Sequence, residues 1–343
     1  MSSTQSHYLE VRSTWLARRV EPIIEPGLPI VDPHHHLWDR NGWRYLHDDL
    51  LGEINAGHNV THTVFVQARA FHRADGPEDL RPVGETEFVN GVAAMSASGI
   101  YGPSRMCAGI VGHANLALGV RVEAVLEAHL AAGGGRFRGI RHITAWDSDP
   151  VMLNPGNPAP AELMGTTAFR EGFARLAAMG LSYDSWLYHP QIPELTALAR
   201  AFPAARIVLD HVGGPLGIGR FAGKGAEVFP AWRAAMAELA TCPNVFVKLG
   251  GLGMRINGYG FEAGAEPPSS ETLAAAWMPY IETTIALFGA DRCMFESNFP
   301  VDKGSYSYAV CWNTFKRLAA GASEAEKAAL FSGTATRFYR LGG

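Results

Sequence analysis

Short apolar runs rich in β-branched residues alternate along this chain with longer segments of helical periodicity. The predicted strands are 28–31, 61–67, 106–112, 139–143, 182–187, 206–211, 245–249 and 292–297. The predicted helices are 84–98, 120–132, 167–179, 191–201, 229–240 and 270–288, followed by 305–319 and 323–338. Strands that alternate with helices in this way predict parallel βα units.

Eight such strands favour a closed α/β barrel of the (β/α)8, or TIM-barrel, class. An open doubly wound sheet is the rival architecture, but the first strand lacks a G-x-G-x-x-G turn after it. No shift in composition divides the chain. We therefore expect an N-terminal extension over 1–28, with one short helix near 8–18, and a single barrel domain over 29–343.

Three consecutive histidines follow the first predicted strand. Alternate residues of a strand point to the same side, so His34 and His36 can face one point while His35 turns away. Two imidazoles that converge at a strand end suit either a metal ion or a pair of acid and base groups. A surface histidine cluster is the plainer interpretation, but this run is embedded in apolar sequence.

Nearly every predicted strand ends in a side chain capable of chemistry. These side chains include Gln67, Arg141, Tyr188 with His189, Asp210 with His211, Lys248, and Glu296 with Asn298. The active site of such a barrel lies at the carboxyl ends of its strands, so this pattern predicts a site. Lys248 could instead be a solvated charge, and Asp210 should point away if His211 points in, because neighbours alternate.

Composition and charge narrow the classes of function. The chain has 343 residues, 47% of them hydrophobic, and 29 basic against 33 acidic side chains give a net charge of −4. This nearly even charge balance does not indicate a protein that binds nucleic acid or an anionic membrane. The four cysteines are scattered, no apolar run reaches the length of a membrane span, and the polar start is unlike a signal peptide. We expect a cytoplasmic protein.

Several of these segments together resemble the amidohydrolase superfamily. They are Val31-Asp32-Pro33-His34-His35-His36, Phe65-Val66-Gln67-Ala68, Arg138-Gly139-Ile140-Arg141, Leu209-Asp210-His211-Val212-Gly213-Gly214-Pro215, Val247-Lys248-Leu249-Gly250 and Phe295-Glu296-Ser297-Asn298-Phe299-Pro300. Within that superfamily the chain looks most like the branch of L-fuconolactonase and 2-pyrone-4,6-dicarboxylate lactonase. The resemblance covers roughly residues 29 to 340 and implies a hydrolase that opens a lactone or similar cyclic ester.

The resemblance also implies roles for single residues. His34, His36 and His189 match metal-binding positions, so one divalent ion, Zn²⁺ first, is expected, although members without a metal leave a metal-independent reaction open. His211 matches the histidine of the sixth strand. Arg141 matches an arginine that engages the polar end of the substrate, and Trp38, Tyr188, Gln67 and Lys248 are expected beside it.

The eighth strand departs from the family pattern. The family has an aspartate that acts as base or metal ligand where this chain has Asn298, and an amide has no usable basicity near neutral pH. Glu296, two residues earlier, is the nearest carboxylate to serve as general base, and an unprotonated His211 or His189 could also activate water. Asn298 is expected to position substrate or water, and Asn298→Asp to leave the barrel folded.

Two further functions stay open at this point. One is a metal-dependent nonoxidative decarboxylase of an aromatic acid, which shares the histidine set but again has an aspartate where this chain has Asn298. The other is a catalytically inactive barrel that binds a small molecule. In each case the expected partner is a small molecule, with no nucleic acid or membrane, and a homo-oligomer is left open.

Overall fold

The computed structural model describes residues 8–40, 42–153 and 159–342. Eight of its strands form one parallel barrel, as predicted. The strands of the barrel are β1 (Pro29–His35), β4 (Asn59–Val66), β5 (Arg105–Gly112), β6 (Phe137–Arg141), β7 (Ser182–Ser185), β8 (Arg206–Leu209), β9 (Val245–Leu249) and β10 (Cys293–Phe295). Each pairs with the next in chain order. These strands are almost wholly buried, which explains their nearly continuous apolar sequences.

The barrel closes between its first and last strands. Among the described residues β1 and β10 form no ladder of their own, but His35, the last residue of β1, forms a parallel bridge with Phe299, just after β10. The His36 N–H donates to the Phe299 carbonyl at 2.8 Å, and the Asn298 N–H donates to the His34 carbonyl at 3.0 Å. The histidine run and the segment after β10 are therefore held side by side at the mouth of the barrel.

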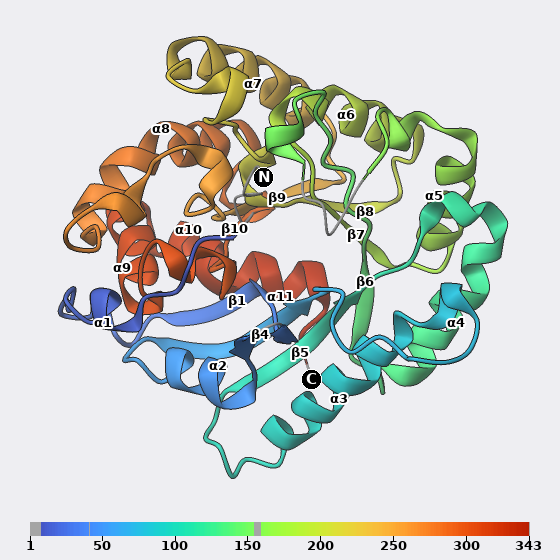
Figure 1. Cartoon of the computed structure of the whole chain (residues 1–343), viewed down its shortest axis with the longest axis horizontal. Coiled ribbons are helices and arrows are strands. Elements are labelled where there is room, and N and C mark those ends of the chain that lie inside the picture. Colours follow the sequence, from blue (N-terminus) through green and yellow to red (C-terminus); the bar gives the residue numbers. More distant parts are fainter. Residues whose placement is uncertain (1–7, 41, 154–158, 343) are drawn as a thin grey trace, which may run out of the picture.

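Helices form a ring outside the strands (Figure 1). They are α1 (Ser13–Leu16), α2 (His47–Ile54), α3 (Val83–Ala97), α4 (Val122–Ala132), α5 (Thr167–Ala178), α6 (Ile192–Ala201), α7 (Gly225–Ala240), α8 (Ser270–Phe288), α9 (Tyr308–Leu318), α10 (Glu324–Ala328) and α11 (Thr334–Tyr339). Hydroxyl side chains cap several N-termini, among them Thr166 before α5 and Ser269 before α8. None of the helices in the described part of the chain is long and apolar enough to span a membrane.

Several regions differ from the prediction: α2 was not predicted, and of the helix expected near 8–18 only α1 forms. The helix expected over 323–338 is interrupted, because a π-helical turn over Ala329–Gly333 separates α10 from α11. The antiparallel hairpin of β2 (Trp38–Arg40) and β3 (Trp43–Tyr45) was not predicted, since three-residue strands are too short to show a periodicity.

The inside of the barrel is layered. At one end Val31, Val64, Val66 and Val208 pack with Phe338 at the end of the chain, so α11 and the residues after it close this end. In Figure 1 α11 lies across the barrel opening. Nearer the carboxyl ends of the strands the inward side chains change to charged ones, which we call the charged layer. It consists of Arg141, Asp184, Asp210, Lys248 and Glu296, together with His34.

Candidate active site

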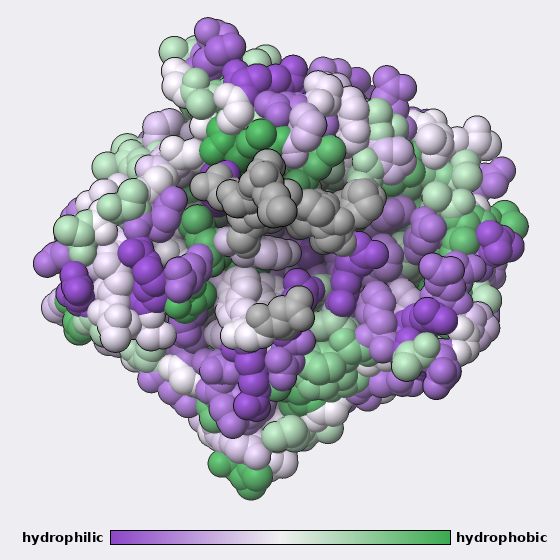
Figure 2. Space-filling view, viewed as in Figure 1, coloured by the Kyte–Doolittle hydropathy of each residue, from purple (hydrophilic) through white to green (hydrophobic). Residues whose placement is uncertain are grey.

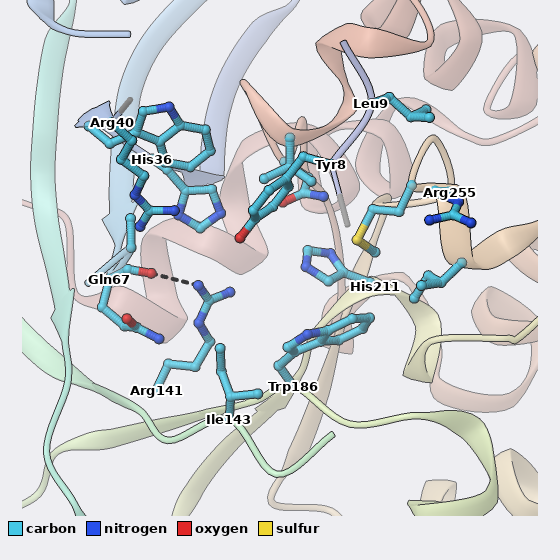
Figure 3. A pocket seen from close by; sticks show the side chains of 16 residues that line it. Tyr8, Leu9, His36, Arg40, Gln67, Arg141, Ile143, Trp186, His211 and Arg255 are labelled. Carbon is cyan, nitrogen blue, oxygen red and sulfur yellow. Dashed lines mark hydrogen bonds between the residues drawn. The ribbon is translucent and has the colours of Figure 1, made fainter. Parts of the chain in front are cut away.

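A pocket opens above the charged layer. Its lining includes Tyr8, His36, Trp38, Arg40, Gln67, Arg141, Trp186, His211, Arg255 and Asn298. In Figure 3 the side chains of Tyr8, Arg141 and His211 point toward the same space from different elements. Several of the residues expected from strand ends thus meet here.

His211 is oriented by a buried carboxylate. Its Nδ1 lies 2.6 Å from Oε1 of Glu296, and its backbone N–H donates to the same oxygen at 3.0 Å. Burial alone would raise the pKa of Glu296, but His211 and His34 outweigh burial and lower it to about 2. An ionised carboxylate only accepts hydrogen bonds, so Nδ1 of His211 carries the proton. In the neutral form of the ring, which lines the pocket, Nε2 is then the nitrogen with the lone pair.

The backbone after β8 places this histidine. His211 and Val212 have φ values of 56° and 46°, so the strict alternation of the strand stops at Leu209. Asp210 and His211 can therefore both lie toward the barrel axis, and the expectation that Asp210 points away is wrong. Asp210 contacts Lys248 at 3.0 Å and Arg141 at 3.6 Å instead.

His34 lies in the floor, with both ring nitrogens engaged by the protein. Nε2 is 3.2 Å from Nη1 of Arg141 and must accept, because a guanidinium only donates. Nδ1 lies 2.7 Å from Oε2 of Glu296 and 3.1 Å from Nζ of Lys248, so it is enclosed between a carboxylate and an ammonium group. Burial and Lys248 lower the pKa of His34 to about 4.

His36 and Arg141 complete the polar lining. Nδ1 of His36 donates to the Val66 carbonyl at 2.7 Å, so Nε2 is an acceptor, and burial with Arg141 nearby keeps the pKa of His36 well below its usual value. Arg141 donates from Nη2 to the Gln67 carbonyl at 2.6 Å (Figure 3). His35, by contrast, contacts the Thr63 hydroxyl at 2.8 Å, away from this pair.

Asn298 is tied to a second carboxylate. Its Nδ2 donates to Oδ1 of Asp302 at 2.9 Å, and Asp302 also accepts from the Gly253 N–H and the Tyr306 hydroxyl. Burial raises the pKa of Asp302 to about 6. Because the amide nitrogen is used in this way, the amide oxygen is the part of Asn298 left to face a ligand in the pocket.

Lys248 is a buried cation and not a solvated strand-end charge. Its Nζ lies 2.7 Å from Oδ2 of Asp184, which also accepts from the Tyr339 hydroxyl at 2.6 Å. Burial opposes its charge, but Asp184 and Asp210 outweigh burial and raise the pKa of Lys248. Lys248 therefore lies beneath the pocket and does not line it.

The donor types of a zinc site occur in this floor. Among the described residues, His34, Asp210 and His211 form a group whose ligand atoms lie within 4.8 Å of one another. The arrangement nevertheless does not fit a bound ion. Both nitrogens of His34 have protein partners, and the Lys248 ammonium sits 3.0 Å from Asp210 and 3.1 Å from His34, so a divalent cation would have to displace it.

Besides His34, Lys248 and Glu296, which lie beneath the pocket, two further predicted residues lie outside its lining. His189 accepts from the Leu216 N–H through Nδ1 at 3.3 Å and packs against Phe221, so the structure does not bring it to His34 and His36. Tyr188 is buried and donates its hydroxyl to the Met152 carbonyl. Both follow β7, but the chain there turns into the short helix that starts at His189.

Other pocket residues had no signal in the sequence. Tyr8 comes from the N-terminal segment, which Arg12 and Trp15 fasten to the loop after β9 through the carbonyls of Glu262 and Gly264. Tyr8 also packs against Trp38 and Trp43, so long-range contacts bring it to the mouth of the barrel. Trp186, directly after β7, could have been proposed from its place at a strand end.

Comparisons with known proteins identify the family of this chain. The family model described as "Amidohydrolase" matches residues 31–341. The uncharacterized protein y4mH of Sinorhizobium fredii is 35% identical over 331 residues, which are 92% of this chain and 99% of that protein. An L-fucono-1,5-lactonase of Burkholderia multivorans is 28% identical over 325 residues, 91% of this chain and 96% of the relative.

A solved structure shows the same architecture. The crystal structure of an amidohydrolase from Burkholderia multivorans with bound zinc is 26% identical, with a TM-score of 0.71, over 91% of this chain and 99% of that one. The predicted barrel and the resemblance are both confirmed. The chain belongs to the amidohydrolase family and is an enzyme of that superfamily.

Proposed function

We propose that the protein is a hydrolase that opens the ring of a lactone. The observation that carries this proposal is the pair of His211 and Glu296, with the second nitrogen of His211 facing a pocket that also holds Arg141. A neutral imidazole oriented by a carboxylate is suited to take a proton from water. Relatives named L-fucono-1,5-lactonase support the choice of substrate class.

In the proposed reaction, the oxygen of a water molecule attacks the lactone carbonyl while His211 Nε2 takes one of its protons. Arg141 donates toward the oxygen that becomes negative, and stabilising such an oxyanion is commonly the largest contribution to catalysis. The ring C–O bond then breaks, and the proton returns from His211 to the leaving oxygen. The second proton of the water stays on the new carboxylic acid and is released to solvent near neutral pH, so the products are one carboxylate, one hydroxyl group and one proton.

Glu296 is a positioning residue in this scheme and not the base that contacts water. It does not line the pocket, and both of its oxygens face histidines. Asn298 offers its amide oxygen to water or substrate, and His36 Nε2 and the Gln67 side chain offer further polar contacts. Trp38 and Trp186 form apolar walls.

No metal ion is needed in this scheme. Lys248 supplies the positive charge in the floor where the family resemblance implies a divalent ion, so we propose a metal-independent reaction. The decarboxylase alternative depends on a bound metal and is therefore less well supported by this arrangement.

The test is a panel of lactones scored by acid release. We expect turnover on at least one class of lactone, with His211→Ala at least about 10²-fold slower and still folded. Arg233→Met, an exposed arginine on α7, is a control that should match the wild type. Release of carbon dioxide from hydroxybenzoates without acid release from any lactone would contradict the proposal.

A further inference from the structure

A second and larger cavity lies beside the pocket. Its volume is about 540 Å³, and Gln67 and Ile143 line both spaces. The pocket over His211 has a volume of only about 60 Å³. That is room for a few water molecules, whereas small-molecule sites commonly need about 300 Å³ or more. A lactone that reaches His211 therefore needs space that the second cavity can supply.

The second cavity is lined by basic and histidine side chains. Arg69, His72, Arg81, His113 and His142 all belong to its wall. Arg69 lies close to the histidines, because after burial its charge is among the causes that lower the pKa values of His72, His113 and His142. On the face shown in Figure 2, hydrophilic side chains gather between the middle of the molecule and the helices α4 and α5.

The acidic side chains in the lining, among the residues that the structure describes, are those of Glu78 and Asp79. Glu78 and Asp79 lie in one short helical turn, and both are exposed. Asp79 forms an ion pair with Arg121 at 3.7 Å, and Arg121 does not line the cavity. The negative charge of Asp79 is therefore partly neutralised from outside the cavity. Gln67 is the lining residue that this cavity shares with the pocket, together with Ile143.

The histidines have fixed hydrogen-bonding roles. Nδ1 of His142 accepts from the Leu116 N–H at 3.2 Å, so in the neutral ring Nε2 carries a proton and is a donor. Nδ1 of His113 donates to the Arg141 carbonyl at 3.2 Å, so its Nε2 is an acceptor. The wall therefore offers a guanidinium and an N–H to an anion, and a lone pair to a hydroxyl group.

Two buried polar atoms on this wall lack partners within the described part of the chain. They are Oε1 of Gln67 and Nε2 of His72. The Gln67 side chain is only 1% exposed and lies where the two cavities meet. Buried polar atoms are nearly always hydrogen-bonded, and leaving one unmet costs about 1–3 kcal/mol. A ligand that extends from one cavity into the other could donate the missing hydrogen bond to Oε1 of Gln67.

We propose that the second cavity binds a carboxylate carried by the substrate. Arg69 and His142 hold this carboxylate, while the lactone carbonyl reaches between Gln67 and Ile143 to Arg141 and His211. The substrate is then a carboxylated lactone. This inference rests on the proposed function. It adds where the protein binds the part of the substrate that does not react.

The test compares a carboxylated lactone with an uncharged partner of the same shape. The γ-lactone of 2-hydroxyglutarate and its hydroxymethyl counterpart form such a pair. For Arg69→Met we expect a KM for the carboxylated lactone about 10- to 100-fold higher, with kcat little changed, and an unchanged KM for the uncharged one. Arg69→Lys should fall in between, and Arg233→Met should behave as the wild type.

A binding measurement separates this inference from the proposed function. Calorimetry with 2-hydroxyglutarate, the ring-opened product, should show a similar loss of affinity in Arg69→Met and none in Arg233→Met. Hydrolysis of both lactones with no effect of Arg69→Met would overturn the inference and leave the lactonase standing. If neither lactone is hydrolysed, equal binding to wild type and Arg69→Met would still overturn it, and weaker binding to the variant would support it.

Discussion

Glu296 holds His211 at two points, because one of its oxygens lies 2.6 Å from Nδ1 of the ring and accepts from the backbone N–H of the same residue at 3.0 Å. The carboxylate thus fixes both the position of the histidine and the nitrogen that carries its proton. Neither residue can perform its proposed role without the other. This dependence leads to a measurable expectation.

The first prediction is that the two residues act as one unit. Glu296→Gln should lower kcat by about 10²-fold or more with little change in KM, since an amide no longer fixes the tautomer of His211. His211→Ala should have an effect of similar size or larger. The double variant should then be hardly slower than His211→Ala alone. Effects that multiply in the double variant would mean that Glu296 has a catalytic part of its own, as the sequence alone suggested.

The second prediction concerns metal. Purified protein should contain well under one equivalent of zinc by elemental analysis and should keep its activity after chelation. In Lys248→Met the ammonium is gone while Asp184 and Asp210 remain buried, so this variant should be less stable than the wild type and should be stabilised by added zinc. Stoichiometric zinc in the wild type, with loss of activity on its removal, would show that the floor holds an ion after all.

The sequence predicts those parts of this site that depend on strand periodicity. His34 and His36 converge because residues two apart in a strand share a side, and Arg141 enters the pocket while His142 faces the second cavity for the same reason. The barrel itself follows from the alternation of strands and helices. Periodicity fails where the backbone leaves the strand: the left-handed φ of His211 lets Asp210 face inward as well.

Long-range contacts are the other limit. Tyr8 belongs to a segment that Arg12 and Trp15 bond to a loop some 250 residues away in the chain, and its ring packs against Trp38 and Trp43. The role of Lys248 depends on Asp184 and Asp210, which come from two other strands. The sequence pattern around each of these residues does not indicate which distant residues it contacts.

A third prediction concerns stability and pH, and it uses a histidine away from the pocket. His129 is buried, with its Nε2 donating to the His113 carbonyl at 2.9 Å and its Nδ1 accepting from Thr86. Burial lowers the pKa of His129 from 6.5 to about 4. Below pH 6.5 His129 therefore binds a proton in the unfolded chain, whereas in the folded protein it stays neutral until the pH falls to about 4. The stabilisation from this neutral histidine is present above pH 6.5 and is lost as the pH falls through that window.

The loss is at most about 3 kcal/mol for this one group. Urea unfolding at pH 7.5 and pH 5 should show that His129→Gln is less stable than the wild type at the higher pH and loses less on acidification. An equal loss in both proteins would assign the acid sensitivity to other groups, such as the buried His34 and His35, whose pKa values burial also lowers, to about 4 and about 3.

The last prediction reverses an expectation from the sequence. Asn298→Asp looked harmless to folding because the two side chains are nearly isosteric. In the structure, however, Nδ2 of Asn298 donates to Asp302 at 2.9 Å, and both residues are buried. An aspartate at 298 would bring two carboxyl groups to about that distance. Two carboxylates so close repel each other, so one of the two would have to bind a proton.

We therefore expect Asn298→Asp to be destabilised by about 1–3 kcal/mol at pH 8 and to recover part of this loss near pH 5, where the pair can share a proton. The double variant Asn298→Asp with Asp302→Asn exchanges donor and acceptor and should regain stability at pH 8. Asp302→Asn alone is the matched control, because it removes the carboxylate without adding another. If Asn298→Asp is as stable as the wild type at pH 8, the hydrogen bond to Asp302 does not hold Asn298 in the pocket, and the family's aspartate could be restored here without cost to the fold.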